Sequence, residues 1–115
     1  MGKEAGRAVA TMPQVIISLN ASSNIRRIRR FYADPQVGDR AIAAIFSSLR
    51  LLLTNPLAGR PMKKRAELRE RVIIFGNQGF VALYKFDPKA DEITILAIRH
   101  QREAGYRQSI ATTEQ

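Results

Sequence analysis

The feature that most constrains the fold is a stripe of apolar residues in the middle of the chain. Its members are Ile42, Ile45, Phe46, Leu49, Leu52 and Leu53. Their spacing follows the 3.6-residue period of an α-helix and predicts a helix with one wide apolar face. Asp34 can cap this helix, Pro35 suits its first turn, and Asn55 followed by Pro56 ends it. Because a face this wide has to be buried, the helix requires a second layer to pack against.

Three runs of β-branched and aromatic residues follow the helix and predict consecutive strands over 67–75, 80–86 and 92–100. The stretches between them, 76–79 and 87–91, have the composition of turns. Strands joined this closely pair as antiparallel neighbours. The last run is apolar on both sides, so we expect it to be central in the sheet.

The N-terminal part predicts one more strand and one more helix. Residues 14–18 are apolar and β-branched, which indicates a strand buried on both faces. Cap-type side chains over 20–24 precede a helix that runs to about Tyr32. Because few residues separate this helix from the striped one, we expect the two to form an antiparallel hairpin.

We predict a single α+β domain over residues 13–106, in the order β-α-α-β-β-β. Its antiparallel-rich four-stranded sheet carries the helical hairpin on one face. Val81 and Leu83 fall on the other face, where either a partner or the two ends of the chain cover them. Residues 1–12 are expected to be a flexible extension and residues 107–115 a polar tail.

The charge balance points to a negatively charged partner. Nineteen Lys and Arg face ten Asp and Glu, which gives a net charge of +9. Such a charge suits nucleic acid, a membrane surface or an acidic protein, although it can also serve only to keep a small protein in solution. The chain has no Cys and one His, which excludes disulfides and thiolate chemistry and argues against a metal site. No cofactor is therefore expected.

Two basic clusters are candidate binding surfaces. The first, between residues 60 and 71, contains Arg60, Lys63, Lys64, Arg65, Arg69 and Arg71. On a strand, Arg69 and Arg71 point to the same face. The second cluster lies on the first helix and contains Arg26, Arg27, Arg29 and Arg30. Each cluster can contact phosphates or an acidic segment, or can be a solvated surface.

The last predicted strand leads directly into Arg99, His100 and Arg102, with Tyr106 four residues further on. His100 can act as a general acid or base, or can form a hydrogen bond to a loop carbonyl. Tyr106 can move a proton, stack on a base or pack against the sheet. The chain has no Gly-rich phosphate loop and no Ser-His-Asp series, so covalent or metal-dependent catalysis is poorly supported.

These segments together resemble the RelE/ParE toxins of bacterial toxin–antitoxin modules. The resemblance runs from about Met12 to Tyr106 and is carried by MPQVIIS, the helical hairpin, LLLTNPLAGRP, GFVALYKF and ILAIRHQREAGY. It implies a cytoplasmic toxin that inhibits growth or stabilises a plasmid. A cognate acidic, ParD-like antitoxin would hold it silent in a hetero-oligomer and could link it to operator DNA.

The two branches of this superfamily differ in target. RelE-like members are metal-independent endoribonucleases that cut mRNA on the ribosome, whereas ParE-like members poison DNA gyrase. The nuclease branch carries an Arg where this chain has Val81, and a Lys near the positions of Val72, Ile73 and Ile74. Apolar side chains cannot offset charge that develops on a phosphate. We therefore expect a ParE-like gyrase inhibitor that acts by binding.

The resemblance and the charge pattern together select the candidate site residues. Target-binding candidates are Arg60, Lys63, Lys64, Arg65, Arg69, Arg71, Arg102 and Tyr106. Antitoxin-binding candidates are Arg26, Arg27, Arg30, Val81, Leu83 and Lys85. If the chain is a nuclease instead, catalysis falls to His100, Tyr106, Arg99, Arg102 and Lys64. A nucleic-acid-binding module without toxicity is a third hypothesis, but no recognition element such as helix-turn-helix supports it.

Overall fold

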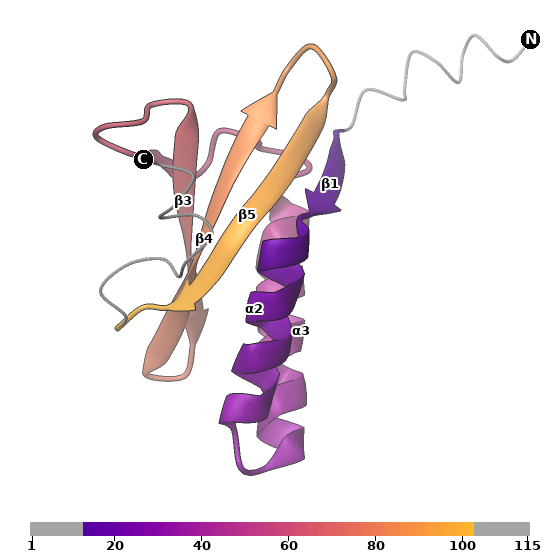
Figure 1. The fold of residues 1–115 in the computed structure, drawn as a ribbon, viewed down its shortest axis with the longest axis vertical. Helices are drawn as coiled ribbons and strands as arrows, with labels where there is room; N and C mark the ends of the chain where they lie inside the picture. Colours follow the sequence, from indigo (N-terminus) through magenta and orange to yellow (C-terminus); the bar gives the residue numbers. More distant parts are fainter. Residues whose placement is uncertain (1–12, 103–115) are drawn as a thin grey trace, which may run out of the picture.

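The computed structural model describes residues 13–102, which hold two helices and five strands (Figure 1). In chain order these are β1 (Gln14–Ile17), α2 (Leu19–Phe31), α3 (Pro35–Leu51), β2 (Arg60–Pro61), β3 (Leu68–Phe75), β4 (Gln78–Asp87) and β5 (Glu92–His100). The predicted extension at 1–12, the predicted tail at 107–115 and Tyr106 lie outside the described residues.

The sheet has five strands in the order β1-β5-β4-β3-β2, so the expectation of four strands is wrong. The additional strand is β2, in which Arg60 and Pro61 pair with Glu70 and Arg69 of β3. A strand of two residues is too short to show the alternation that identifies strands in a sequence. The sheet is mixed, because β1 runs parallel to β5 while the other neighbours are antiparallel. Strand β5 lies inside the sheet between β1 and β4, as expected from its apolar sequence, and β4 takes the middle position.

Helix α3 confirms the prediction from the apolar stripe. The Asp34 carboxylate accepts a hydrogen bond of 2.9 Å from the Gln36 backbone N–H, and proline occupies the first turn. Ile45 and Leu49 are buried against the sheet, while Phe46 on the edge of the stripe is 39% exposed. The capped start and the apolar face therefore act together to fix where this helix begins and how it packs.

Helix α2 begins earlier than predicted, because Ser18 is its N-cap. The predicted cap residues lie inside the helix and bind the neighbouring strand instead. Asn24 is buried, and its Oδ1 accepts a hydrogen bond of 2.9 Å from the Ile98 N–H. Asn20 donates through Nδ2 to the Leu96 carbonyl at 3.0 Å. These side chains satisfy backbone groups of β5 beyond the end of its short pairing with β1.

The main core lies between the helical hairpin and one face of the sheet (Figure 1). Ile28 of α2, Ile45 of α3, and Phe80 and Tyr84 of β4 are fully buried there. Full burial of a large apolar side chain stabilises a fold by about 1.5–3 kcal/mol. Strand β1 lies at the edge of the sheet and its Ile16 is 38% exposed, so the expectation of a strand buried on both faces is wrong.

The other face of the sheet, which we call the open face, carries a smaller apolar cluster. Leu68, Leu83 and Ala97 are buried in it, and Met62 from the segment before β3 packs against them. A register shift between Leu83 and Tyr84 marks a bulge in the β4–β5 pairing at this cluster. The chain therefore covers part of its own open face with a loop, a possibility that the sequence did not suggest.

Candidate functional site

Strand alternation places the neighbouring residues Arg99 and His100 on opposite faces of the sheet. His100 pairs with Phe80 and shares its side of the sheet, which the helices cover. Arg99 pairs with Val81 on the open face. The predicted nuclease cluster therefore does not come together on one surface in the described part of the chain.

His100 belongs to an aromatic cluster between α2 and the sheet. Its ring centroid lies 4.8 Å from that of Phe31, 5.1 Å from that of Phe80 and 6.4 Å from that of Tyr32. Burial raises the pKa of the Tyr32 phenol above its ordinary value. These ring contacts give His100 a packing role, which was not among the two roles considered from the sequence.

Arg99 is held on the open face by oxygen atoms of its own chain. Its Nη1 donates to the carbonyls of His100 at 3.1 Å and Gln101 at 3.3 Å. Its Nη2 lies 3.9 Å from Oε2 of Glu70, and the two side chains are 16% and 19% exposed. A guanidinium engaged in this way has little capacity left to stabilise a phosphate.

The open face beside Arg99 is apolar. Val81 of β4 is 4% exposed, and its pairing partner Val72 of β3 is 45% exposed. Ile74, two residues further along β3, is 79% exposed. These are the positions at which the resemblance to the nuclease branch called for basic side chains. All three are aliphatic, and Val72 and Ile74 are exposed.

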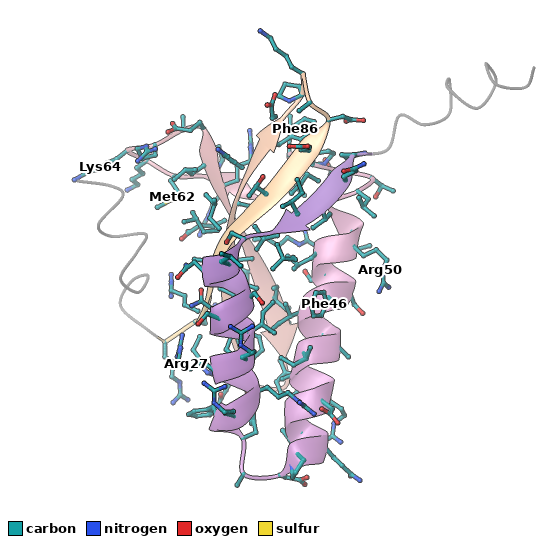
Figure 2. All side chains as sticks on the ribbon, turned by 45° about the vertical axis from the view of Figure 1, so that its right-hand side comes forward. Arg27, Phe46, Arg50, Met62, Lys64 and Phe86 are labelled. Atoms are coloured by element: carbon teal, nitrogen blue, oxygen red, sulfur yellow. The ribbon has the colours of Figure 1, made fainter. Side chains whose placement is uncertain are left out.

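A pocket of about 410 Å³ lies where α2, the β3–β4 turn and the end of β5 meet; we call it the His100 pocket. It is lined by Arg27, Phe31, Asn77, Gln78, Gly79, His100, Gln101 and Arg102. The fold thus brings the predicted residues His100 and Arg102 together with Arg27, which Figure 2 shows on α2 near the end of β5. Sequence reasoning missed Phe31, whose only signal was its flanking position on an amphipathic helix.

The basic loop, residues 57–66, forms a separate pocket of about 470 Å³. It is lined by Arg60, Pro61, Met62, Lys63, Lys64, Arg65 and Glu70. Arg60, Lys63 and Lys64 are exposed, and Figure 2 shows Lys64 on this loop. The Arg65 Nε donates to Glu67 at 2.7 Å, and this contact lowers the pKa of the Glu67 carboxyl. The exposed cations of the loop are therefore the ones that remain open to a target.

Arg69 and Arg71 share one face of β3, as their spacing predicts, but both are bound to neighbouring segments. Arg69 donates through Nη1 to the carbonyls of Leu57 at 3.1 Å and Gly59 at 2.7 Å. Arg71 donates through Nε to Oγ of Ser48 on α3 at 3.1 Å. These two arginines tie the basic loop and α3 to the sheet, which gives them a structural role that the sequence did not indicate.

Two of the residues predicted to contact the antitoxin, Val81 and Leu83, have buried side chains in this structure. Val81 is 4% exposed, and Leu83 is fully buried in the apolar cluster of the open face. Lys85 is exposed, as are Arg26 and Arg30 on α2. The charged antitoxin candidates therefore remain available, whereas the two apolar ones do not.

An apolar groove of about 260 Å³, which we call the β1–α3 groove, lies between strand β1 and helix α3. It is lined by Val15, Ile17, Phe46, Leu49, Arg50 and Leu53. Figure 2 shows Phe46 and Arg50 on the outer side of α3. Because β1 ends the sheet, its outer backbone edge has no strand beside it among the described residues. Sequence reasoning had assigned Phe46 and Leu53 to the core stripe and so missed this groove.

Two other kinds of site are missing from the described region. Residues 13–102 contain no group of three or more His, Cys, Asp or Glu side chains placed to hold a metal ion. No helix in that range is long and apolar enough to cross a membrane.

The fold is that of solved structures of toxin–antitoxin systems. A structure described as the chromosomal ParDE system from P. aeruginosa matches with a TM-score of 0.63 and 22% identity, over 79% of this chain and 98% of that chain. The RelBE2 toxin–antitoxin complex from Mycobacterium tuberculosis matches with a TM-score of 0.56 and 19% identity, over 78% and 99% of the two chains. These likenesses define the class of fold, which is the α+β fold of RelE/ParE toxins.

Sequence comparison identifies the family within this class. The model of the family described as the ParE toxin of the type II toxin–antitoxin system parDE matches residues 15–105. The curated protein Toxin RelE3 of Caulobacter vibrioides is 32% identical over 94 residues, which cover 80% of this chain and 98% of that protein. The chain therefore belongs to the ParE toxin family of the RelE/ParE superfamily, which confirms the resemblance seen in its sequence.

Proposed function

We propose that this chain is a ParE-like toxin that inhibits DNA gyrase by binding it, and that a cognate antitoxin neutralises it. Family membership supports the role of toxin. The choice of target rests on one observation: on the open face, Val72 pairs with Val81 beside an Arg99 that already contacts Glu70.

That arrangement lacks what cleavage of RNA requires. A metal-independent nuclease needs cations to offset the negative charge that develops on the phosphate, and a group to move the 2′-hydroxyl proton. Val72 and Val81 provide neither function. Arg99 is held by carbonyls and a carboxylate, and His100 faces the opposite side of the sheet. Action through binding is the function that these side chains support best.

The gyrase-binding surface in this proposal is the exposed part of the basic loop, with Arg60, Lys63 and Lys64. Exposed cations on a protruding loop attract an acidic protein surface or the DNA that gyrase holds. Arg69 and Arg71 stabilise this surface, because their hydrogen bonds connect β3 to the basic loop and to α3. Arg102 and Tyr106 stay predicted target contacts.

We assign the β1–α3 groove to an apolar stretch of the antitoxin. Both similar structures are described as toxin–antitoxin systems or complexes. The groove exposes Phe46, places Arg50 beside it, and adjoins the open edge of β1, where an extended segment can gain backbone hydrogen bonds. The net charge of +9 favours an acidic partner, whose carboxylates can meet Arg50, Arg26 and Arg30.

A gyrase supercoiling assay with the purified full-length chain tests the target. Supercoiling should stop and cleaved DNA should accumulate, and added antitoxin should reverse both effects. The variant Lys63→Ala/Lys64→Ala should inhibit less than the native chain. The control Arg40→Ala/Lys89→Ala removes the same charge from exposed positions outside the loop and should inhibit normally. Normal supercoiling at saturating protein contradicts the proposal.

A ribosome-dependent mRNA endonuclease is the second candidate function. The name of the relative Toxin RelE3 and the meeting of His100 with Arg102 in one pocket favour it. Purified ribosomes programmed with a defined mRNA provide the test. Codon-positioned cleavage that is lost in His100→Ala or Tyr106→Phe, together with unaffected gyrase, would establish the nuclease in place of the gyrase inhibitor.

A further inference from the structure

We propose that the His100 pocket binds one nucleotide of a single-stranded nucleic acid, with the base stacked on Phe31 and the phosphate held by Arg27 and Arg102. This site goes beyond the proposed function. Arg102 is also a predicted target contact, but neither the pocket of the basic loop nor the β1–α3 groove shares a residue with the His100 pocket. The inference rests on the combination of an exposed aromatic ring, two arginines and a cavity of suitable size.

Phe31 is the stacking platform. The side chain is 65% exposed, whereas Ile25 and Ile28 of the same helix pack against the core. Its ring is braced by Tyr32, at a centroid distance of 5.1 Å and an interplanar angle of 89°, and by His100 at 4.8 Å and 56°. These contacts hold the ring in place and leave much of it open to solvent. A base can stack on such a ring whatever its identity, because every base has a π-face.

Arg27 and Arg102 provide the positive charge. They come from α2 and from the segment after β5, and they line the same pocket as the exposed ring. The planar guanidinium matches two oxygens of a phosphate, and arginine also stacks on bases. Arg27 and Arg102 are the charged side chains among the described residues that line this pocket, apart from the titratable His100.

The size and the polar groups of the pocket suit a single nucleotide. Its volume of about 410 Å³ lies at the lower end of the range for small-molecule sites, about 300–1,000 Å³. The amides of Asn77, Gln78 and Gln101 can donate to and accept from base edges. Glycine at position 79 allows the backbone to approach β3 closely at this point of the pocket, because a Cβ there would lie 2.5 Å from the Ile73 carbonyl oxygen.

The other pockets combine cations and aromatic rings differently. The pocket of the basic loop has cations but no aromatic ring, and it includes Glu70. The β1–α3 groove is lined mainly by apolar side chains. A further pocket joins Arg29 and Arg30 to Tyr32, whose side chain is partly buried. Among these pockets, the His100 pocket is the one that places arginines beside an aromatic side chain that is mostly exposed.

Fluorescence anisotropy with labelled oligonucleotides of about eight nucleotides tests the stacking, since one small binding module covers about 4–16 nucleotides. The purified full-length chain should bind single-stranded DNA or RNA, and Phe31→Ala should weaken binding about fivefold or more. Phe31→Trp keeps a ring and should restore binding. Leu19→Ala is the matched control, because Leu19 is 89% exposed on the same helix but lies outside the pocket. Melting temperatures of all variants verify that they fold.

A salt titration tests the phosphate contact. Arg102→Ala should weaken binding and reduce the slope of affinity against salt by about one, as expected for loss of one phosphate contact. Arg40→Ala removes the same charge from an exposed site on α3 and should have a smaller effect. Parallel DNA and RNA probes of equal length identify which nucleic acid is preferred.

The proposal is overturned if the native chain binds neither probe, or if Phe31→Ala binds like the native chain. Equal losses in Arg40→Ala and Arg102→Ala also overturn it, because they indicate binding to overall charge. The measurement contains no gyrase and no antitoxin. A negative result in this binding assay therefore does not affect the outcome of the supercoiling assay. A negative result in the supercoiling assay likewise does not affect this proposal.

Discussion

The hydroxyl of Tyr84 accepts a hydrogen bond of 2.8 Å from the backbone N–H of Gly59. The same hydroxyl donates to the carbonyl of Pro56 at 2.7 Å, and the tyrosine is fully buried. A Cβ on Gly59 would lie 2.7 Å from a ring carbon of Tyr84, so only glycine permits this approach. A residue of the central strand therefore sets the position at which the basic loop begins.

Tyr84→Phe should destabilise the fold by about 1–3 kcal/mol, because it leaves the buried Gly59 N–H and the partly buried Pro56 carbonyl without their partner. Urea denaturation measures the change in the free energy of unfolding. Tyr32→Phe is the matched control, since the Tyr32 hydroxyl is buried with no hydrogen-bond partner among the described residues. Similar losses in the two variants would mean that the Tyr84 hydrogen bonds contribute little.

The stability of the native chain should fall at alkaline pH. Burial raises the pKa of the Tyr84 phenol above the ordinary value of 10.0, an effect that the Gly59 hydrogen bond reduces in part. The folded state thus favours the neutral phenol, so its contribution is fully present below about pH 10 and is lost as the pH rises further. Unfolding free energies measured across this range should decline less steeply for Tyr32→Phe/Tyr84→Phe than for the native chain.

Asn24→Ala should destabilise the fold by about 1–3 kcal/mol, because it removes the acceptor of the buried Ile98 N–H. Hydrogen exchange at the Ile98 amide should also accelerate. Ser23→Ala, at an exposed neighbouring position of α2, serves as control and should change stability little. Unchanged exchange at Ile98 would contradict the role given to Asn24 at this edge of β5.

Phe46→Ala should weaken binding of the antitoxin by about 2 kcal/mol, or about thirtyfold in Kd, if the ring is an anchor in the β1–α3 groove. Toxicity of the variant without antitoxin should persist. Leu51→Ala is the control, since Leu51 is 57% exposed on α3 but does not line the groove. Calorimetry with the purified antitoxin and rescue of growth by it provide the two measurements, and equal losses in both variants would exclude this docking site.

Hydrophobic periodicity and helix capping explain most of the secondary structure that could be predicted from the sequence. The stripe of α3, its Asp34 cap and the strands β3, β4 and β5 follow from periodicity and capping, which act over a few neighbouring residues. The same reasoning predicted that Arg69 and Arg71 share a face. It could not tell which face, because that depends on where the helical hairpin packs.

The sequence by itself determined the family, the two helices, the main strands and the basic character of this protein. Only the tertiary structure decided that the helices cover the face on which His100 lies, that Asn24 binds a strand, and that Phe31 meets Arg102 in one pocket. The physical reason is that these contacts join segments far apart in the chain. Periodicity and capping carry no information about such partners, which are chosen by the packing of the helical hairpin on the sheet.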